Sequence, residues 1–363
     1  MSECPIPKSG VMKIAPYVPG KSSAPLVKQT IKLSSNESPL GASPMAIDAL
    51  GGLGKNLASY PDASSKGLKN ALAQVHGLNA DQLVIGAGSD EILHLLAQVY
   101  LGEGDEAIIS QYGFLMYPIA ILGAGAKPVV APDRDYVVDV EAMLGAVTPA
   151  TKMVFLANPN NPTGTYLNAG ELKRLHQGLP KSVLLVVDCA YAEYVTAEDY
   201  SVGIDLVEAN ENVVMVRTFS KMGLAALRIG WMLGPEKIVD ALNRLRGPFN
   251  INMAAQMAGE AAARDVQFTT RLKDHNEKWR SWLGARLHGN GIRVLPSQGN
   301  FILAMFDKDA GVSAAQANEA LLAQGIVVRE MGAYGLPDAL RISIGTASAM
   351  EKVAQILKDL NIK

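Results

Sequence analysis

The stretch that decides the fold is Val213-Val-Met-Val-Arg-Thr-Phe-Ser-Lys-Met-Gly-Leu-Ala-Ala-Leu-Arg228. It opens with four apolar residues bounded by polar ones, which is typical of a short buried strand. The strand delivers Lys221 to its end, with the hydroxyls of Thr218 and Ser220 before it and Arg228 after it. An amine beside hydroxyls and a fixed cation suits a covalent imine to a cofactor that also carries a phosphate.

Short apolar runs alternate with longer helical stretches upstream of this segment, from about residue 83 to residue 216. These runs are apolar on both faces, as strands buried between two helical layers must be. The predicted strands are 83–85, 106–109, 128–130, 153–156, 183–187 and 213–216. Such alternation predicts an α/β fold with right-handed crossovers and a mainly parallel sheet. A long helical stretch, 254–287, then leads to strands near 300–305 and 340–344, so we expect a smaller C-terminal domain.

Composition narrows the class of protein. The 363 residues are 48% apolar and 19% charged, as in an ordinary globular protein with a sizeable core. A net charge of −2 gives no electrostatic case for binding nucleic acid or an anionic membrane. Two cysteines cannot form a disulfide framework, and the N-terminus lacks the apolar core of a signal peptide, so a cytoplasmic protein is expected. Residues 1–30 are expected to form an extended arm.

A glycine turn, Gly86-Ala-Gly-Ser-Asp-Glu91, follows the first of the predicted strands and opens a helix. Free backbone N–H groups and the helix dipole make such a turn an anion site, and phosphate is the usual occupant. The glycines allow the backbone to approach the anion closely. An ordinary strand-to-helix turn with an Asp cap remains the alternative interpretation.

Two further motifs follow strands. The first, Asn158-Pro-Asn-Asn-Pro-Thr-Gly164, is a rigid loop that can present Asn161 to a ligand oxygen. The second, Asp188-Cys-Ala-Tyr191, ends five apolar residues with a carboxylate. A carboxylate at a buried strand end is costly unless it meets a cation, and a protonated ring nitrogen is one such cation. A helix N-cap is the alternative role for Asp188.

Together these motifs resemble those of the fold-type I pyridoxal-phosphate (PLP) enzymes of the class I/II aminotransferase superfamily. The segments Leu33–Pro44, Ala15–Gly20 and Tyr60–Asp62 are similar to those of the histidinol-phosphate aminotransferases in particular. The resemblance covers nearly the whole chain. It implies a seven-stranded, mainly parallel sheet in α/β/α layers plus a smaller α+β domain. The implied divisions are an arm (1–34), a large PLP-binding domain (35–255) and a small domain (256–363).

The resemblance also implies roles for named residues. Lys221 would bind the cofactor and shuttle protons, Asp188 would pair with the pyridinium nitrogen, and Tyr191 would tune the cofactor through its phenolic oxygen. The residues implied to bind the cofactor are Tyr60, Ser89, Asp90, Phe114, Asn161, Asp188, Tyr191, Ser220, Lys221 and Arg228. Tyr112 competes with Phe114 for stacking on the ring. Tyr60 would reach a phosphate in the neighbouring subunit, which implies a homodimer with shared active sites.

Substrate recognition is implied for Tyr17, Asn36, Arg329 and Arg341. Arg341 interrupts an otherwise apolar strand, which favours an anionic partner. The implied reaction converts L-histidinol phosphate and 2-oxoglutarate into imidazole-acetol phosphate and glutamate, a step of histidine biosynthesis.

Three other functions remain open on the sequence. They are an aromatic or broad-specificity aminotransferase, a decarboxylase resembling threonine-phosphate decarboxylase, and a ligand-binding relative without catalysis. The joint presence of Lys221, Asp188 and Tyr191 weighs against the last of these. The five histidines are scattered without paired ligand spacing, so no metal site is expected.

Overall fold

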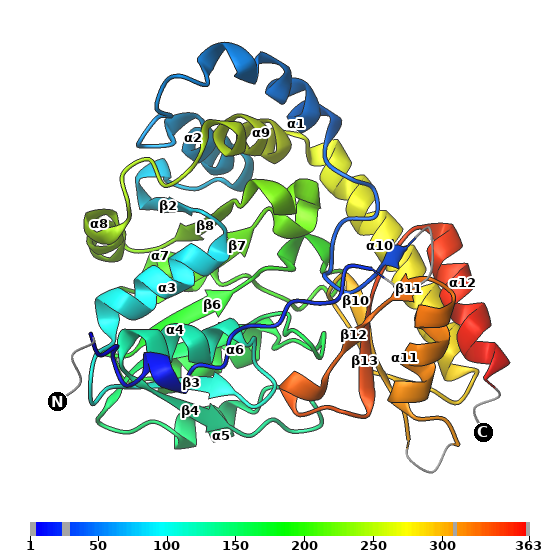
Figure 1. The fold of residues 1–363 in the computed structure, drawn as a ribbon. Helices are drawn as coiled ribbons and strands as arrows, with labels where there is room; N and C mark the ends of the chain where they lie inside the picture. The colour runs from blue at the N-terminus through cyan, green and yellow to red at the C-terminus, as the bar shows by residue number, and fades with distance from the viewer. Residues whose placement is uncertain (1–4, 24–29, 308–310, 361–363) are drawn as a thin grey trace.

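The computed structural model describes residues 5–23, 30–307 and 311–360. The chain forms two lobes, one around a seven-stranded sheet and one around a four-stranded sheet (Figure 1). We call them the large lobe and the small lobe. Within the described ranges, no helix is both long enough and apolar enough to span a membrane.

The sheet of the large lobe is mainly parallel, which confirms the prediction. Its strand order is β2-β8-β7-β6-β5-β3-β4, and only β8 runs against its neighbours. The strands are β2 (Leu83–Gly86), β3 (Glu106–Ser110), β4 (Lys127–Ala131), β5 (Thr151–Ala157), β6 (Leu184–Asp188), β7 (Val213–Thr218) and β8 (Gly230–Leu233). The six predicted strands are all present, whereas β8 was not predicted.

Helices cover both faces of this sheet. Successive side chains of a strand point to opposite faces, so each strand contributes to both apolar layers. Along β6, Leu185 and Val187 enter one apolar cluster, while Leu184 and Val186 enter the other. The first cluster is completed by α2 (Lys66–His76), α5 (Val140–Gly145), α6 (Ala169–Gly178), α7 (Ile204–Ala209) and α9 (Met253–Arg264). The second is completed by α3 (Ser89–Tyr100), α4 (Met116–Ala124) and α8 (Glu236–Leu245). The result is the expected α/β/α layering.

The small lobe has an antiparallel sheet of order β12-β13-β10-β9. The strands are β9 (Arg293–Val294), β10 (Phe301–Met305), β12 (Arg329–Glu330) and β13 (Ala339–Ser343), and α11 (Ala314–Ala323) and α12 (Ala347–Asp359) join their apolar cluster. The predicted single helical stretch 254–287 is wrong in one respect, because α9 and α10 (Val266–His288) are separate helices. Asp265 divides them, since its carboxylate accepts from the backbone N–H of Phe268 as an N-cap.

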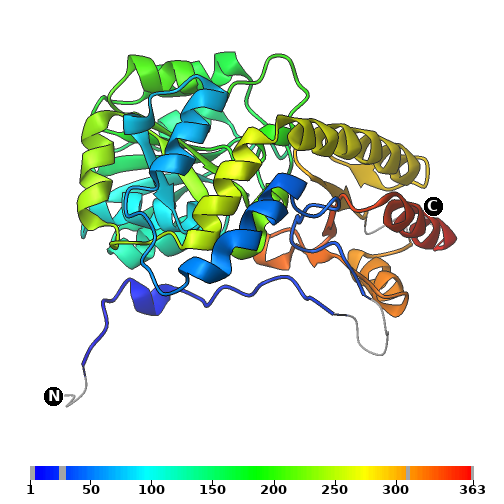
Figure 2. The same ribbon diagram turned by 90° about the horizontal axis from the view of Figure 1, so that it is seen from above.

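The N-terminal segment connects the two lobes. Its described part, 5–23, runs along the outside of the large lobe toward the small lobe (Figures 1 and 2), while 1–4 and 24–29 lie outside the described residues. The short strand β1 (Ile31–Lys32) then pairs in parallel with β11 (Ile326–Val327). After it, the chain returns to the large lobe and forms α1 (Pro44–Ala49). The expected boundaries at 34 and 255 stay predictions.

Candidate active site

The carboxyl edge of the large sheet holds a cavity of about 180 Å³. It forms there because β5, β6 and β7 are parallel neighbours that end at the same edge. The predicted residues that line it are Ser89, Asp90, Phe114, Asn161, Asp188, Tyr191, Ser220, Lys221 and Arg228. The fold therefore brings together motifs that lie far apart in the sequence.

One end of the cavity has the character of an anion site. Ser89 begins α3, and Gly88 before it has φ +84°. A Cβ at Gly88 would lie 2.6 Å from Nη2 of Arg228, so only glycine lets the guanidinium lie over the turn. Arg228 donates to Ser220 Oγ (3.3 Å) and to Asp90 Oδ2 (3.1 Å). A helix N-terminus, a hydroxyl and an arginine in one place fit a phosphate group.

The carboxylate of Asp188 lies at the end of β6 and is 4% exposed. Its Oδ2 accepts a hydrogen bond from the hydroxyl of Tyr117 (2.9 Å), whereas its Oδ1 has no partner among the described residues. Burial raises the pKa of Asp188 to about 6, and the bond from Tyr117 opposes that rise. A cationic N–H in the cavity would satisfy the free oxygen and keep the carboxylate ionised.

Tyr117 was missed by the sequence analysis. It lies in the first turn of α4, where its ring stacks on Phe155 with centroids 5.0 Å apart and meets Phe114 edge to face at 5.8 Å. Nothing near it in the sequence is polar enough to mark it, because its partner Asp188 lies 71 residues away. The only available signal was a tyrosine in an otherwise apolar helix.

Lys221 enters the cavity from the turn that follows β7. Burial, followed by the nearby charges of Arg341 and Arg228, lowers the pKa of Lys221 to about 8. The amine lies 3.4 Å from the carbonyl oxygen of Ser35. Tyr194, also missed from the sequence, donates its hydroxyl to the Lys221 carbonyl and so holds the turn in place. An amine that loses its proton this readily can attack a carbonyl carbon.

Arg341, on β13 of the small lobe, does not line the cavity itself but reaches Asn161, which does. It is 6% exposed, and its Nη1 donates to Asn161 Oδ1 (2.5 Å) while its Nη2 donates to the carbonyl of Ser34 (2.8 Å). The guanidinium lies over the ring of Phe301 at 5.4 Å, and its Nε has no partner among the residues described. A buried, partly unpaired guanidinium next to the cavity is suited to a bidentate anionic ligand.

Of the two aromatic residues predicted to stack on the cofactor, Phe114 lines the cavity. Tyr112 instead stacks on Tyr136, with ring centroids 5.5 Å apart. Tyr60 is 80% exposed and stacks on Phe249 at 4.6 Å, so it does not reach the cavity of its own chain.

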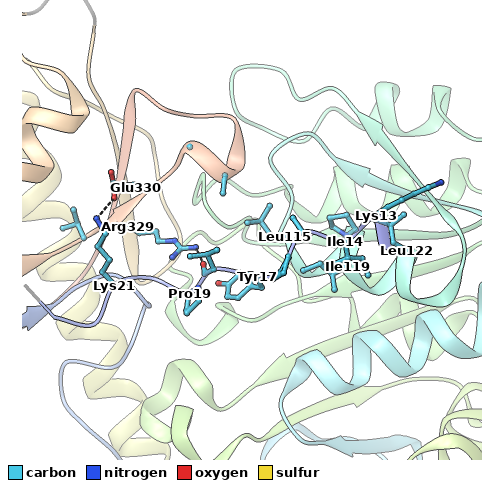
Figure 3. Close-up of a pocket in the computed structure, with 17 residues that line it drawn as sticks. Lys13, Ile14, Tyr17, Pro19, Lys21, Leu115, Ile119, Leu122, Arg329 and Glu330 are labelled. Carbon is cyan, nitrogen blue, oxygen red and sulfur yellow. Dashed lines mark hydrogen bonds and ion pairs between the residues drawn. The ribbon is translucent and has the colours of Figure 1, made fainter. Parts of the chain in front are cut away.

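Tyr17 and Arg329 line a second pocket of about 600 Å³, which we call the outer pocket (Figure 3). It lies between the N-terminal arm, α4 and β12. The guanidinium of Arg329 lies 5.9 Å from the centre of the Tyr17 ring and donates to the carbonyl of Val18 (2.7 Å). The pair therefore ties the arm to the small lobe. Asn36, predicted to bind substrate, lines neither pocket.

The residues present fit a phosphorylated pyridine aldehyde. The Oδ1 of Asp188, unpartnered among the residues that the structure describes, suits a protonated ring nitrogen. The amine of Lys221 suits the aldehyde, and the Ser89–Arg228 end suits the phosphate. These three groups are the donor and acceptor set that such a cofactor requires.

Comparison with known proteins agrees with this chemistry. The family model for class I and II aminotransferases matches residues 28–357. The histidinol-phosphate aminotransferase of Nitrobacter hamburgensis is 51% identical over 357 residues, which cover 98% of both chains. That of Rhodopseudomonas palustris is 51% identical over 361 residues, which cover 99% of both.

Solved structures share the fold. The histidinol-phosphate aminotransferase from Sinorhizobium meliloti, in complex with pyridoxal-5'-phosphate, matches with a TM-score of 0.86 at 29% identity, over 92% of this chain and 90% of that one. The L-threonine-O-3-phosphate decarboxylase from Porphyromonas gingivalis matches with a TM-score of 0.78 at 21% identity, over 91% of this chain and 98% of that one. Because the family model spans nearly the whole chain and the relatives align along all but a few residues, this chain belongs to the class I and II aminotransferase family.

Proposed function

We propose that this protein is a homodimeric, PLP-dependent aminotransferase that converts L-histidinol phosphate and 2-oxoglutarate into imidazole-acetol phosphate and glutamate. The observation that carries the chemistry is the buried Oδ1 of Asp188, which has no partner among the described residues and lies in the same cavity as the low-pKa amine of Lys221. We infer the identity of the substrate from the relatives at 51% identity, which are histidinol-phosphate aminotransferases. The cysteine usage of the sequence supports a cytoplasmic location.

The bound cofactor would supply an electron sink for the carbanion formed at the substrate. Asp188 holds a proton at the ring nitrogen, because an ionised carboxylate favours the charged form of its partner. Lys221 would hold the cofactor, and its amine would accept the proton that leaves the substrate carbon. Asn161 and Tyr191 line the cavity and would hydrogen-bond the phenolic oxygen, while Phe114 would cover the ring and exclude water.

Arg341 would bind the anionic end of the substrate, with Arg329 and Tyr17 assisting from the outer pocket. Arg341 is buried, and its Nε is unpaired within the described part of the chain. Arg329 comes from the edge of the small lobe, and Tyr17 comes from the arm. The two alternative enzyme functions differ in the anion that Arg341 would bind or in the reaction that follows. An aromatic aminotransferase would use Arg341 for a carboxylate, and a threonine-phosphate decarboxylase would lose carbon dioxide. The decarboxylase from Porphyromonas gingivalis, at 21% identity, supports only the shared fold.

Single-turnover absorbance distinguishes these reactions. We expect the cofactor-loaded protein to convert its cofactor rapidly with histidinol phosphate, and not with phenylalanine or threonine phosphate. Conversion with phenylalanine alone would favour an aromatic aminotransferase. Release of carbon dioxide from threonine phosphate would instead indicate a decarboxylase.

Substitution Arg341→Lys is expected to raise the KM for histidinol phosphate by about 10- to 100-fold, the equivalent of one or two hydrogen bonds to a charged group. The kcat should change less than the KM, because lysine keeps the positive charge but cannot form a bidentate pair with the anion. Arg244→Ala is a control, since the Arg244 side chain is 77% exposed and pairs with Asp240 on its own helix. An unchanged KM in Arg341→Lys would place the anion elsewhere.

Capture of pyridoxal phosphate by the cofactor-free protein should accelerate as the pH rises through about 8. Only the unprotonated amine attacks the aldehyde, and burial lowers the pKa of Lys221 from 10.5 to about 8, so the reactive form appears at lower pH than for a solvated lysine. Stopped-flow absorbance at a series of pH values measures this midpoint. A midpoint near the ordinary lysine value would show that the amine is solvated.

Shared active sites can be tested by complementation. Tyr60 is exposed together with Met45 and Ile47 of α1 and Leu57, as expected for a surface that pairs with a second copy. Lys221→Ala and Tyr60→Ala chains, each inactive or weak alone, should regain activity when mixed after unfolding and refolding. The mixed dimer then contains one site with both residues native. No recovery in a mixture shown to be dimeric by light scattering would contradict shared sites.

A further inference from the structure

Asn36 is a fully buried residue between β1 and α1 whose polar groups reach three parts of the protein. Its backbone has φ +55°, a left-handed conformation that asparagine tolerates better than most residues. Its side chain Nδ2 donates to the hydroxyl of Tyr191 (3.0 Å). Its Oδ1 bonds to Ser343 Oγ (2.9 Å), and its carbonyl accepts from Asn300 Nδ2 (2.9 Å). Asn36 therefore connects the large lobe to the small lobe.

The direction of each hydrogen bond in this group is fixed by its neighbour. The backbone N–H of Asn36 can only donate, so Ser343 Oγ accepts it at 2.8 Å. The hydroxyl proton of Ser343 is then free to donate to Asn36 Oδ1. With Oδ1 turned toward Ser343, the amide NH₂ faces Tyr191, whose oxygen must accept. The hydroxyl proton of Tyr191 is left over.

The remaining proton of Tyr191 is available to a ligand in the cavity, because Tyr191 lines that cavity. Burial raises the pKa of Tyr191 above its usual range, so the hydroxyl keeps its proton. The charged groups that face Tyr191 are Lys221, whose Nζ lies 5.9 Å from the ring centre, with Arg341 and Asp188. None of them is hydrogen-bonded to its hydroxyl in the described part of the chain.

We propose that Asn36, clamped by Ser343, is a positioning residue that makes Tyr191 a hydrogen-bond donor to the phenolic oxygen of the cofactor. This inference rests on the proposed function, because that oxygen is the acceptor. Ser343 lies two residues after Arg341 on β13, so the same strand that holds the substrate anion also sets the proton of Tyr191. The direct substrate contact expected for Asn36 stays a prediction.

Donation by Tyr191 stabilises negative charge on the phenolic oxygen. Without it, the oxygen attracts the proton of the adjacent nitrogen contributed by Lys221 more strongly, so that nitrogen titrates at higher pH. The pH midpoint of the visible absorbance of the bound cofactor measures this directly, without turnover. Tyr191→Phe should raise the midpoint by roughly one pH unit, as expected for loss of one bond to the charged form.

Asn36→Asp is the sharpest variant, because aspartate tolerates the same backbone conformation but accepts the proton of Tyr191 instead of donating to it. We expect Asn36→Asp to raise the pH midpoint at least as far as Tyr191→Phe does. In a protein that already carries Tyr191→Phe, adding Asn36→Asp should raise the midpoint by less than half of the shift that Asn36→Asp causes alone. The double variant thus separates diversion of the proton from the added charge. Ser343→Ala, which frees the amide to turn over, should give a smaller rise that vanishes in the Tyr191→Phe background.

Ser297→Ala is the matched control. The hydroxyl of Ser297 likewise accepts from a backbone N–H, that of Gly299, and donates to the carbonyl of Phe301, but it does not contact Asn36. The pH midpoint of the cofactor absorbance in Ser297→Ala should equal that of the unsubstituted protein. The inference is overturned if Asn36→Asp and Ser343→Ala both titrate like the unsubstituted protein, or if their shifts are undiminished with phenylalanine at 191. If the unsubstituted protein shows no lysine-bound cofactor absorbance at all, the proposed function itself fails along with it.

Discussion

Lys221→Ala is expected to abolish turnover, with a loss of roughly 10⁴-fold or more, the upper end of what one positioned proton-transfer group contributes. The loss should be this large because Lys221 has two tasks in the proposed reaction, to anchor the cofactor and to move the proton. The alanine variant should also lose the visible absorbance of the lysine-bound cofactor. Steady-state kinetics and an absorbance spectrum of the purified protein measure both effects.

A surface lysine supplies the control for this variant. Lys237 has a side chain that is 89% exposed and forms a long, 3.9 Å ion pair with Glu211, so Lys237→Ala should retain the spectrum and the rate. Circular dichroism of both variants checks that the fold is intact. Full activity in Lys221→Ala would refute the assignment of the site, because no other lysine lines the cavity in the described part of the chain.

Asp188→Asn should retain bound cofactor but lose about 10²- to 10⁴-fold in kcat. The amide can still accept from Tyr117, so the packing around it survives, but it cannot hold a proton at the ring nitrogen. The kcat should fall more than the affinity for cofactor, because phosphate and lysine contacts remain.

Asp133→Asn is a matched control for that variant. Asp133 is also a desolvated carboxyl whose pKa is raised to about 6 by burial, yet it contacts the backbone of Tyr112 and does not line the cavity. Equal losses in the two variants would show that the effect of Asp188→Asn comes from general destabilisation. A large loss in Asp188→Asn alone would support its role at the ring nitrogen.

Features that depend on a local pattern of apolar and polar residues could be predicted from the sequence. The strands of the large sheet were found because Val213–Val216 and its counterparts are apolar on both faces, and the cavity residues were found because each follows such a strand. The strand β8 was missed because Ile229 alone separates it from Arg228, the end of the Lys221 motif. Its four residues also do not alternate between apolar and polar side chains. The break at Asp265 was missed because a single capping residue scarcely interrupts a helical pattern.

Contacts between distant segments could not be predicted. Tyr117 reaches Asp188 across 71 residues, and Arg341 reaches Asn161 across 180. Asn36 illustrates the same limit, because its motif pointed to the site while its partner Ser343 lies 307 residues away. Which groups remain unpaired depends on such contacts, and so does the role of each polar side chain.

The pairing of β1 with β11 has a consequence for how the protein is made on the ribosome. Ile31 leaves the ribosome early, while its partner Ile326 follows roughly 300 residues later, which at about 5–20 residues per second is a delay of about 15–60 s. The large lobe is translated entirely within that interval. The strand β1 must therefore stay unpaired until nearly the end of synthesis, when its pairing with β11 closes a loop as long as most of the chain.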